Sequence, residues 1–179
     1  EPVSSMRDVL VKNLPQVEVL AGNAESIPLE DQSLDAVFVA NAFHWFDAPK
    51  ALAEIRRVLK IGGGLGLIWL NDGVFSSPWG KGIDQMLIPF ESLAPQRKSG
   101  VWRKAFDQSD FFSPLQEQQL RHEREITPDL VIDRVASLSF IAVLQETENR
   151  AFLERVKGLL ETHPLTAGRP THKVECTTD

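Results

Sequence analysis

An alternation of apolar strand and amphipathic helix near the start of the chain constrains the fold more than any other feature. The apolar run Leu34–Ala40 has the composition of a strand that is buried on both faces. A helix follows, which Asp47 caps and in whose first turn Pro49 lies, and then Leu65–Leu70 forms a second apolar run. Parallel strands joined by right-handed helical crossovers give this order. We therefore predict an α/β fold with a Rossmann-like, doubly wound, mostly parallel sheet.

The remaining elements are predicted from periodicity and from turn residues. An amphipathic first helix is expected within residues 3–14 and is closed by Pro15, and a short strand is expected over 17–20. Gly62, Gly63 and Gly64 are expected to end the helix that Asp47 caps. The second half is richer in Pro, Gln and charged residues, and its predicted elements are helices over 80–93, 128–137 and 146–162 and strands over 116–126 and 173–177.

Composition excludes several classes of protein. A chain of 179 residues suits one domain, and 42% hydrophobic with 25% charged residues is globular rather than disordered. No apolar run approaches the roughly 20 residues that span a bilayer, and no signal-peptide pattern opens the chain. The net charge of −6 argues against nucleic acid as a partner. The single Cys176 and scattered histidines predict no metal site, and the cytoplasm is the expected location.

Candidate binding residues lie in loops that follow predicted strands, because ligands of doubly wound sheets bind beyond the carboxyl ends of the strands. In the first loop, Asn23 places an amide beside free backbone, an arrangement that reads the edge of a purine ring. The alternative is an Asx-type turn that only links the loop to the next strand.

The second loop has the sequence NAFHWFD and carries an amide, an imidazole and three aromatic rings at the end of a strand. His44 has the ordinary pKa of a general base near neutrality, although a histidine between aromatic residues is more often structural. Trp45 and Phe46 either line a ligand pocket or cover the core.

The chain resembles the class I S-adenosylmethionine-dependent methyltransferases in three stretches that occur in the same order. These are GNAESIPLEDQSLDAV, NAFHWF and ALAEIRRVLKIGGGLGLIW. The resemblance is to the small-molecule branch that includes trans-aconitate-type methyltransferases, and it covers residues 1–70. Stretches such as SGVWRKAF and ITPDLVIDRVASLSF look like the variable C-terminal part of that branch. The resemblance implies one domain over residues 1–179, with a partial cofactor-binding core in 1–70 and a mostly helical substrate or lid part, with the last strands, in 71–179.

The resemblance also implies S-adenosylmethionine as cofactor and assigns binding roles by position. Glu1 looks like the acid that accepts hydrogen bonds from the ribose hydroxyls. Asn23 and Ala24 resemble the pair at the adenine edge, where the family often has aspartate in place of the asparagine. Asn41 and Ala42 resemble the backbone segment beside the methionine moiety.

On the acceptor side, the resemblance places His44 and Trp45 toward the transferred methyl group, with His44 as the catalytic candidate. Asn71 is a further candidate for the substrate pocket. If the acceptor is a carboxylate, Arg103 could clamp it, and if the acceptor is a hydroxyl, a base such as His44 matters more. The alternative for Arg103 is a solvated surface position. The expected function is methyl transfer to a small molecule.

One departure from the family is the glycine-rich loop after the first strand, for which residues 1–179 offer no counterpart. The series GGGLG at 62–66 precedes a strand, whereas the family's loop follows one. We therefore expect an N-terminally truncated sheet, with three explanations open: a missing or deleted N-terminus, a naturally shortened product, or a partner chain that supplies the strand. A homo-oligomer through the incomplete sheet and a catalytically inactive binding or assembly module are the corresponding alternatives. A third possible function is that of a nicotinamide-dependent oxidoreductase. The series AESIPLEDQSLDAV, which resembles the methyltransferases, disfavours it.

Overall fold

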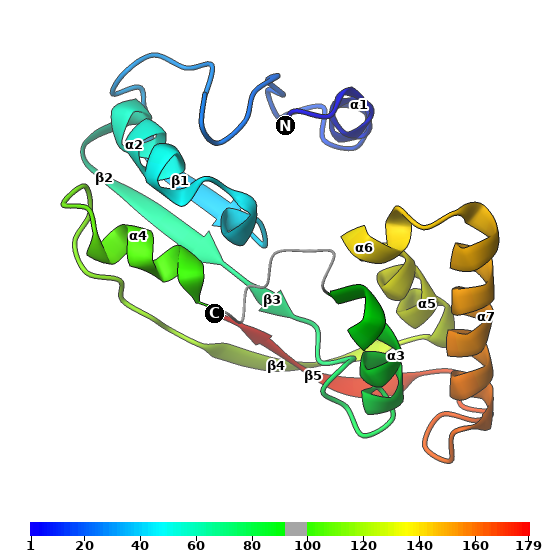
Figure 1. Cartoon of the computed structure of the whole chain (residues 1–179). Coiled ribbons are helices and arrows are strands. Elements are labelled where there is room, and N and C mark those ends of the chain that lie inside the picture. Colours follow the sequence, from blue (N-terminus) through cyan, green and yellow to red (C-terminus); the bar gives the residue numbers. More distant parts are fainter. Residues whose placement is uncertain (92–99) are drawn as a thin grey trace. The chain divides into compact units, whose positions relative to one another are not determined.

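The computed structural model of the chain describes residues 1–91 and 100–179. These residues fall into two compact units, each of which has buried side chains of its own (Figure 1). Unit 1 comprises residues 1–68 and 100–116, and unit 2 comprises residues 69–91 and 117–179. The boundary, between Ile68 and Trp69, falls inside the second predicted apolar run and close to the change in composition that the sequence shows.

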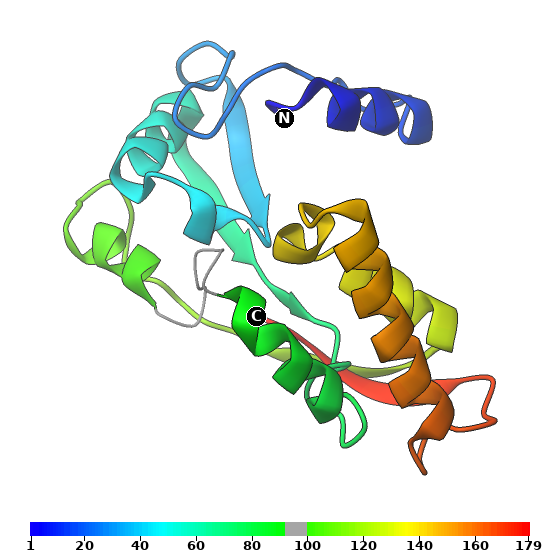
Figure 2. The ribbon, with the colours of Figure 1, turned by 45° about the vertical axis from the view of Figure 1, so that its right-hand side comes forward.

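The sheet of unit 1 has the predicted crossover. Strands β1 (Leu34–Ala40) and β2 (Leu59–Ile68) are parallel, and helix α2 (Ala48–Val58) connects them (Figure 2). Asp47 caps α2 by accepting a hydrogen bond from the Lys50 amide at 3.5 Å. The α/β class predicted from the sequence is therefore confirmed.

The apolar side of α2 forms most of the core of unit 1. Five of its residues are buried, namely Ala48, Ala51, Leu52, Ile55 and Val58. Phe43 and Leu59 are also buried in this unit. At about 25 cal/mol per Å² of apolar surface, this burial is the main favourable contribution that α2 makes to stability.

The prediction that three glycines end this helix is wrong. The helix ends at Val58, and the glycines lie inside β2. The pairing of β1 with β2 shifts in register between Leu34 and Ala36, and a Cβ on Gly63 would lie 2.9 Å from the Asp35 carbonyl oxygen. The glycines therefore serve a close approach of two strands at an irregular point of the sheet.

Two further predictions about strands need correction. The apolar run 65–70 is divided, because β2 ends at Ile68 and Leu70 begins strand β3 (Leu70–Asn71) of unit 2. Residues 17–20 form no strand, and the part of the chain that the structure describes offers them no neighbouring strand. A strand exists only where a neighbour takes up its backbone hydrogen bonds.

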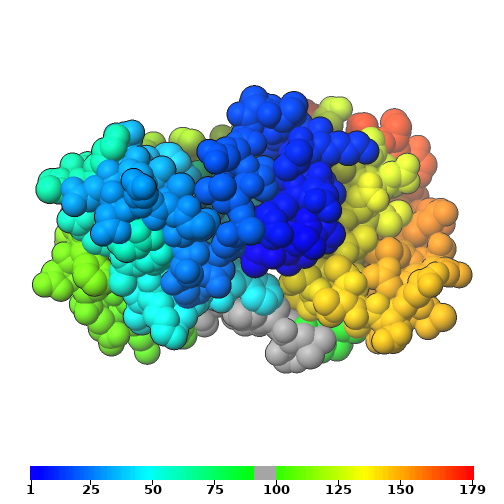
Figure 3. Space-filling view, turned by 90° about the horizontal axis from the view of Figure 1, so that it is seen from above, coloured from blue at the N-terminus to red at the C-terminus, as the bar shows by residue number. Residues whose placement is uncertain are grey.

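Helix α1 (Ser4–Asn13) confirms the predicted first helix and lies at the surface of unit 1 (Figure 3). None of its residues is buried, and Met6, Val9 and Val11 are each more than half exposed. Unit 1 also contains three short helical segments, which are η1 (Phe43–Trp45), η3 (Val101–Arg103) and α4 (Lys104–Asp107).

Each of the two described strands of the first sheet has an open edge. Among residues 1–91 and 100–179, β1 pairs with β2 and with no other strand. Phe38 on β1 is 70% exposed, and it lies directly opposite Gly66 of β2. A Cβ on Gly66 would come within 2.6 Å of the Phe38 ring, so the ring covers the backbone where the glycine has no side chain.

Unit 2 contains an antiparallel sheet with the strand order β3-β5-β4. Strand β4 is Leu120–Ile126 and β5 is His172–Thr178. They correspond to the strands predicted over 116–126 and 173–177. Along β5, buried His172, Val174 and Cys176 alternate with exposed residues, as expected for a sheet covered on one face.

Four helices belong to unit 2. They are α3 (Lys81–Glu91), α5 (Pro128–Ala136), α6 (Ser139–Ala142) and α7 (Glu146–Thr162). The predicted helices over 128–137 and 146–162 are confirmed, and the prediction over 80–93 is confirmed as far as residue 91, since 92 and 93 lie outside the described residues. The helices bury a single cluster against the sheet, which includes Trp79, Ile83, Val131, Val135, Ile141, Phe152, Val156 and Leu160.

A buried ion pair stabilises the loop that follows β3. The Asp72 side chain is 7% exposed, and one of its oxygens accepts a hydrogen bond from Arg134 Nε on α5. The other oxygen accepts from the Val74 amide at 3.1 Å, and Cys176 Sγ donates to the Asp72 carbonyl at 3.3 Å. A buried carboxylate requires such partners, since its desolvation is otherwise costly.

The core of unit 2 predicts a clear difference between two apolar truncations. We expect Phe152→Ala, at a side chain that is 3% exposed, to lower the free energy of unfolding by about 3–5 kcal/mol. Val143→Ala, at a side chain that is 74% exposed, should change it by less than about 0.5 kcal/mol. Urea denaturation of the two variants measures both values, and similar values for the two would contradict the assigned core.

Candidate functional site

The chain turns sharply where β1 ends. Asn41 has a φ of +53°, and its amide donates to the Ile68 carbonyl at the end of β2 at 2.8 Å. The left-handed region is costly for most residues and is tolerated best by glycine and asparagine. The turn places the exposed Asn41 and the half-buried Ala42 beyond the carboxyl edge of the sheet. This is the edge at which doubly wound sheets bind ligands.

Phe43 anchors the segment that follows this turn. It is fully buried, and its ring lies 5.7 Å from Phe46, 6.0 Å from Trp102 and 5.5 Å from Phe106, measured between centroids. Such aromatic contacts stabilise beyond the area that they bury. The sequence analysis gave Phe43 no role of its own, although its place among the aromatic residues of NAFHWFD is the signal that could have identified it.

His44 and Trp45 follow this anchor. His44 is half-buried and Trp45 is 47% exposed, with their rings 5.8 Å apart. The role of Trp45 in a ligand pocket stays a prediction. The backbone here is fixed by a hydrogen bond from the Trp45 amide to the Ala42 carbonyl at 2.9 Å.

The loop that precedes β1 is bound to the start of α2. Within it, the Ser26 amide donates to the Asn23 carbonyl at 3.3 Å, and Glu25 Oε1 accepts from the Asp47 amide at 3.0 Å. The hydrogen bond of this turn therefore runs between backbone groups, and no side-chain bond of Asn23 occurs in the described part of the chain. Asn23 is exposed and Ala24 is half-buried. The amide proposed for the purine edge thus faces solvent.

The first residue lies beside the same loop. The Glu1 amino group donates to the Leu20 carbonyl at 3.2 Å, while Glu1 Oε1 accepts from the Val3 amide at 2.9 Å. Hydrogen bonds therefore connect three segments of unit 1 that carry candidates, which are the N-terminus, the loop around Asn23 and the segment from Asn41 to Asp47.

The two remaining candidates differ in placement. Arg103 belongs to unit 1, and its guanidinium lies 4.7 Å from the centroid of the Trp102 ring, which in turn contacts Phe43. Asn71 belongs to unit 2, where its Oδ1 accepts a hydrogen bond from the Gly73 amide at 3.2 Å. Asn71 also lines an open groove together with Arg121 and Glu175. Arg103 is thus connected to Phe43 through the Trp102 ring, whereas Asn71 belongs to the other unit.

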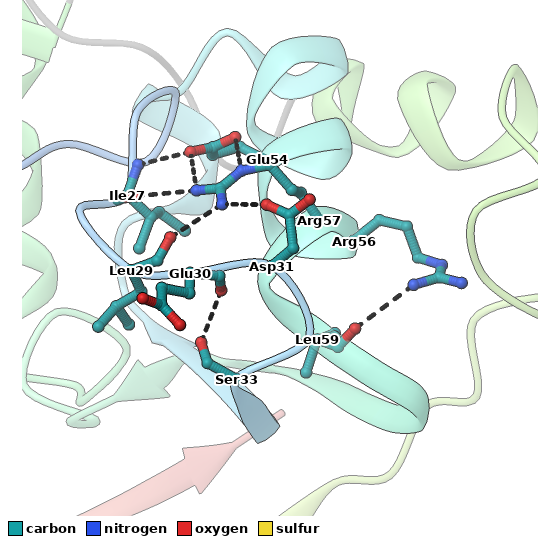
Figure 4. Close-up of polar contacts among 9 residues, drawn as sticks. All are labelled: Ile27, Leu29, Glu30, Asp31, Ser33, Glu54, Arg56, Arg57 and Leu59. Carbon is teal, nitrogen blue, oxygen red and sulfur yellow. Dashed lines mark hydrogen bonds and ion pairs between the residues drawn. The ribbon is translucent and has the colours of Figure 1, made fainter.

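A network on α2 was missed by the sequence analysis (Figure 4). Arg57 forms a bidentate pair with Glu54, at 2.7 and 2.9 Å, and donates to Asp31 Oδ1 at 2.7 Å. It also donates to the carbonyls of Leu29 and Ile27, at 2.8 and 2.9 Å. The spacing of Glu54 and Arg57 on a helix could have indicated the pair, but nothing local indicates its partners in the loop.

This network changes the titration of Glu54. Hydrogen bonds from the Arg57 guanidinium and from the Ile27 amide lower the pKa of Glu54 to about 2. Both donors favour the carboxylate over the acid. Glu54 is therefore charged at every pH at which the protein is handled.

Residues 1–91 and 100–179 contain neither a group of metal-ligating side chains nor a membrane-spanning helix. These residues contain no group of three or more His, Cys, Asp or Glu side chains arranged to hold a metal ion. None of the helices in the same residues has the length and apolar character needed to cross a membrane.

Known proteins resemble this chain most clearly in unit 1. Residues 1–67 match a family model that describes a methyltransferase domain. An uncharacterized methyltransferase of Mycobacterium tuberculosis is 36% identical over 167 residues, which are 93% of this chain and 65% of that protein. Residues 1–67 are thus similar to a methyltransferase domain. An uncharacterized methyltransferase-like protein of Schizosaccharomyces pombe is also 36% identical, over 89% of this chain and 61% of that protein.

Solved structures show the same fold. A protein of Anaeromyxobacter dehalogenans assigned to the type II methyltransferases matches 99% of this chain and 74% of its own, with a TM-score of 0.64 and 18% identity. A protein of Anabaena variabilis assigned as a methyltransferase of an antibiotic biosynthesis pathway gives a TM-score of 0.53 at 16% identity, over 99% of this chain and 78% of its own. The predicted Rossmann-like class is confirmed, while the similarity to trans-aconitate-type enzymes stays a prediction.

The lowered pKa of Glu54 predicts a pH dependence of stability. Its folded pKa lies below the ordinary value of 4.5, so its contribution is complete above about pH 4.5 and is lost as the pH falls toward 2. We expect the difference in unfolding free energy between the native chain and Glu54→Gln to shrink between pH 5.5 and pH 3. Urea denaturation at both pH values measures it.

The matched control for this experiment is Glu18→Gln, at an exposed position in the N-terminal segment. This variant should differ from the native chain by the same amount at both pH values. A constant difference for Glu54→Gln as well would contradict the network.

Proposed function

We propose that this chain binds S-adenosylmethionine and serves methyl transfer to a small-molecule acceptor, a carboxylate or a hydroxyl. The observation that carries the proposal is the family match over residues 1–67, which are nearly all of the first segment of unit 1. Hydrogen bonds there connect the loops that carry the candidate residues. The chain spans 65% and 61% of its mycobacterial and fission-yeast relatives, so the activity of the whole protein is part of the proposal.

In this proposal, the loop before β1 binds the adenosine part of the cofactor. Asn23 accepts a hydrogen bond from the exocyclic amine through its side-chain carbonyl, and Ala24 lies against the ring. Glu1 accepts from the ribose hydroxyls through the carboxylate oxygen that does not hold Val3. The exposure of Asn23 and the bond between the Glu1 amino group and Leu20 support these assignments.

The turn after β1 binds the methionine part of the cofactor. The left-handed conformation of Asn41 turns the backbone of Asn41 and Ala42 outward at the carboxyl edge of the sheet, which supports this role. Backbone amides and carbonyls there suit the amino and carboxyl groups of an amino acid. Trp45, which is 47% exposed, excludes water from the reacting groups.

Methyl transfer from a sulfonium is an in-line displacement. Bound S-adenosylmethionine would supply an electrophilic methyl group, which the acceptor oxygen would take as the sulfur leaves as a neutral thioether. The protein has to align these atoms, and a hydroxyl acceptor must also lose its proton. We assign that proton to His44 and the binding of a carboxylate acceptor to Arg103, both in unit 1. Asn71, in unit 2, stays a separate prediction.

We also propose where the protein acts and with which partners. The acidic charge and the absence of a membrane-spanning helix from the described residues support a cytoplasmic protein with a small-molecule substrate and without nucleic acid. The open edge of β1 supports a homo-oligomer that forms through this sheet.

Titration of S-adenosylhomocysteine into the chain tests the cofactor assignment by calorimetry. We expect micromolar binding that weakens by about 1–3 kcal/mol in Asn23→Ala and in Glu1→Ala, because each removes a polar contact to the ligand. Asn13→Ala, at an exposed position at the end of α1, should bind like the native chain. A folded chain that releases no heat would instead favour an inactive binding or assembly module.

Transfer of a labelled methyl group tests the role of His44. With small hydroxyl acceptors, His44→Gln should lower the rate by about 10² or more, because the acceptor then keeps its proton. With small carboxylate acceptors the rate should be unchanged, and affinity for S-adenosylhomocysteine should be unchanged in both cases. Equal losses with both classes of acceptor would show that His44 only supports the fold.

A further inference from the structure

Arg57 uses every N–H group of its guanidinium. Nε donates to Glu54, Nη1 donates to the Leu29 carbonyl and to Asp31, and Nη2 donates to the Ile27 carbonyl and to Glu54 (Figure 4). A guanidinium has five such donors in a rigid plane, so this set of acceptors fits arginine and no other side chain. Lysine offers a single nitrogen and reaches a subset of them.

The network holds the backbone of the loop as well as a side chain. Glu54 Oε1 accepts from the Ile27 amide at 2.8 Å, while Arg57 donates to the carbonyl of the same residue at 2.9 Å. Both polar backbone groups of Ile27 are thus bound to α2. The position of the loop at Ile27 is therefore fixed by α2 and not by the identity of the loop's own side chains.

The other end of the same stretch is also bound to α2. The Asp47 amide at the N-terminus of the helix donates to Glu25, and Glu54 lies about two turns further along the helix. Residues at this spacing share one face of a helix, and this face borders the one that is buried in the core of unit 1. The segment from Asn23 to Ile27 therefore has fixed points at Glu25 and at Ile27.

We propose that Arg57, together with Glu54, is a positioning residue that holds the segment Asn23–Ile27 in the shape that binds the adenosine part of the cofactor. This inference rests on the proposed function, because it assumes that Asn23 contacts the cofactor. Arg57 acts through the loop backbone and does not itself touch the ligand.

The neighbouring arginine provides a matched control. Arg56 is also half-buried on α2, but its described hydrogen bond is to the Leu59 carbonyl, at 3.4 Å, at the end of its own helix. Replacing Arg56 or Arg57 by glutamine removes the same charge from adjacent positions. The two variants differ in whether the loop is released.

The test is a double-mutant cycle that is read out by calorimetric titration of S-adenosylhomocysteine. Arg57→Gln should weaken binding by about tenfold and Arg56→Gln by less than about twofold. Asn23→Ala should cost about tenfold in the native and Arg56→Gln backgrounds but less than about twofold in the Arg57→Gln background, because the released loop no longer presents residue 23. Additive losses would overturn the inference, since they would mean that Arg57 acts on the fold as a whole.

Hydrogen exchange provides a second readout that needs no ligand. The hydrogen-bonded amides of Ser26, Ile27 and Leu29 should lose protection in Arg57→Gln, while those of β1 and β2 keep it. Where Arg57→Gln fails to fold, Arg57→Lys takes its place and should show the same loop-specific loss. Unchanged protection of the loop would overturn the inference.

The two proposals fail in different ways. If the native chain does not bind S-adenosylhomocysteine, the proposed function falls and this inference falls with it. If the native chain binds and Arg57→Gln binds equally well, the inference alone is overturned.

Discussion

The parallel pairing of β1 with β2 is the constraint on which unit 1 depends. Two parallel neighbours need a connection that crosses over the sheet, and α2 is that connection. One face of the helix must then be apolar, because it packs on the sheet, while the other face is left to contact whatever precedes β1. Glu54 and Arg57 occupy this second face. The same element thus builds the core and holds the loop that carries Asn23.

Unit 2 depends on a different balance of interactions. Its antiparallel strands are covered by helices on one face, and the core between them is aliphatic and aromatic. The ion pair of Asp72 with Arg134 is the main polar contact at the edge of this core. Burial of Asp72 costs free energy that its hydrogen bonds offset, so the pair fixes where the loop after β3 lies more than it adds to stability.

Much of the fold was predictable because several helices and strands have clear signals in their own local sequence. The crossover helix and α7 have strong 3.6-residue periodicity, and the cap at Asp47 marks where α2 begins. The errors concern features that depend on partners far away in sequence. Residues 17–20 have the composition of a strand, but no neighbouring strand in the described residues pairs with them. The glycines around Gly63 leave room for the backbone of Asp35, which approaches closely.

The candidate site divides in the same way. The position of Asn41 follows from the strand order, whereas the strand that was predicted before Asn23 does not form. The structure places both residues in unit 1. The anchor at Phe43 and the role of Arg57 could not be read from the sequence, because each depends on contacts across 28 to 63 residues of chain or through backbone carbonyls. Only tertiary structure identifies such contacts.

The pairing of Phe38 with Gly66 has a consequence for how the two positions tolerate change. The ring of Phe38 shields the peptide groups on either side of Gly66, so the strand pair has one side chain where two would normally lie. Any side chain at 66 must displace the ring, and a small residue at 38 uncovers the strand. Changes at these two positions in related sequences should therefore be correlated, with a bulky residue on one strand accompanied by a glycine on the other.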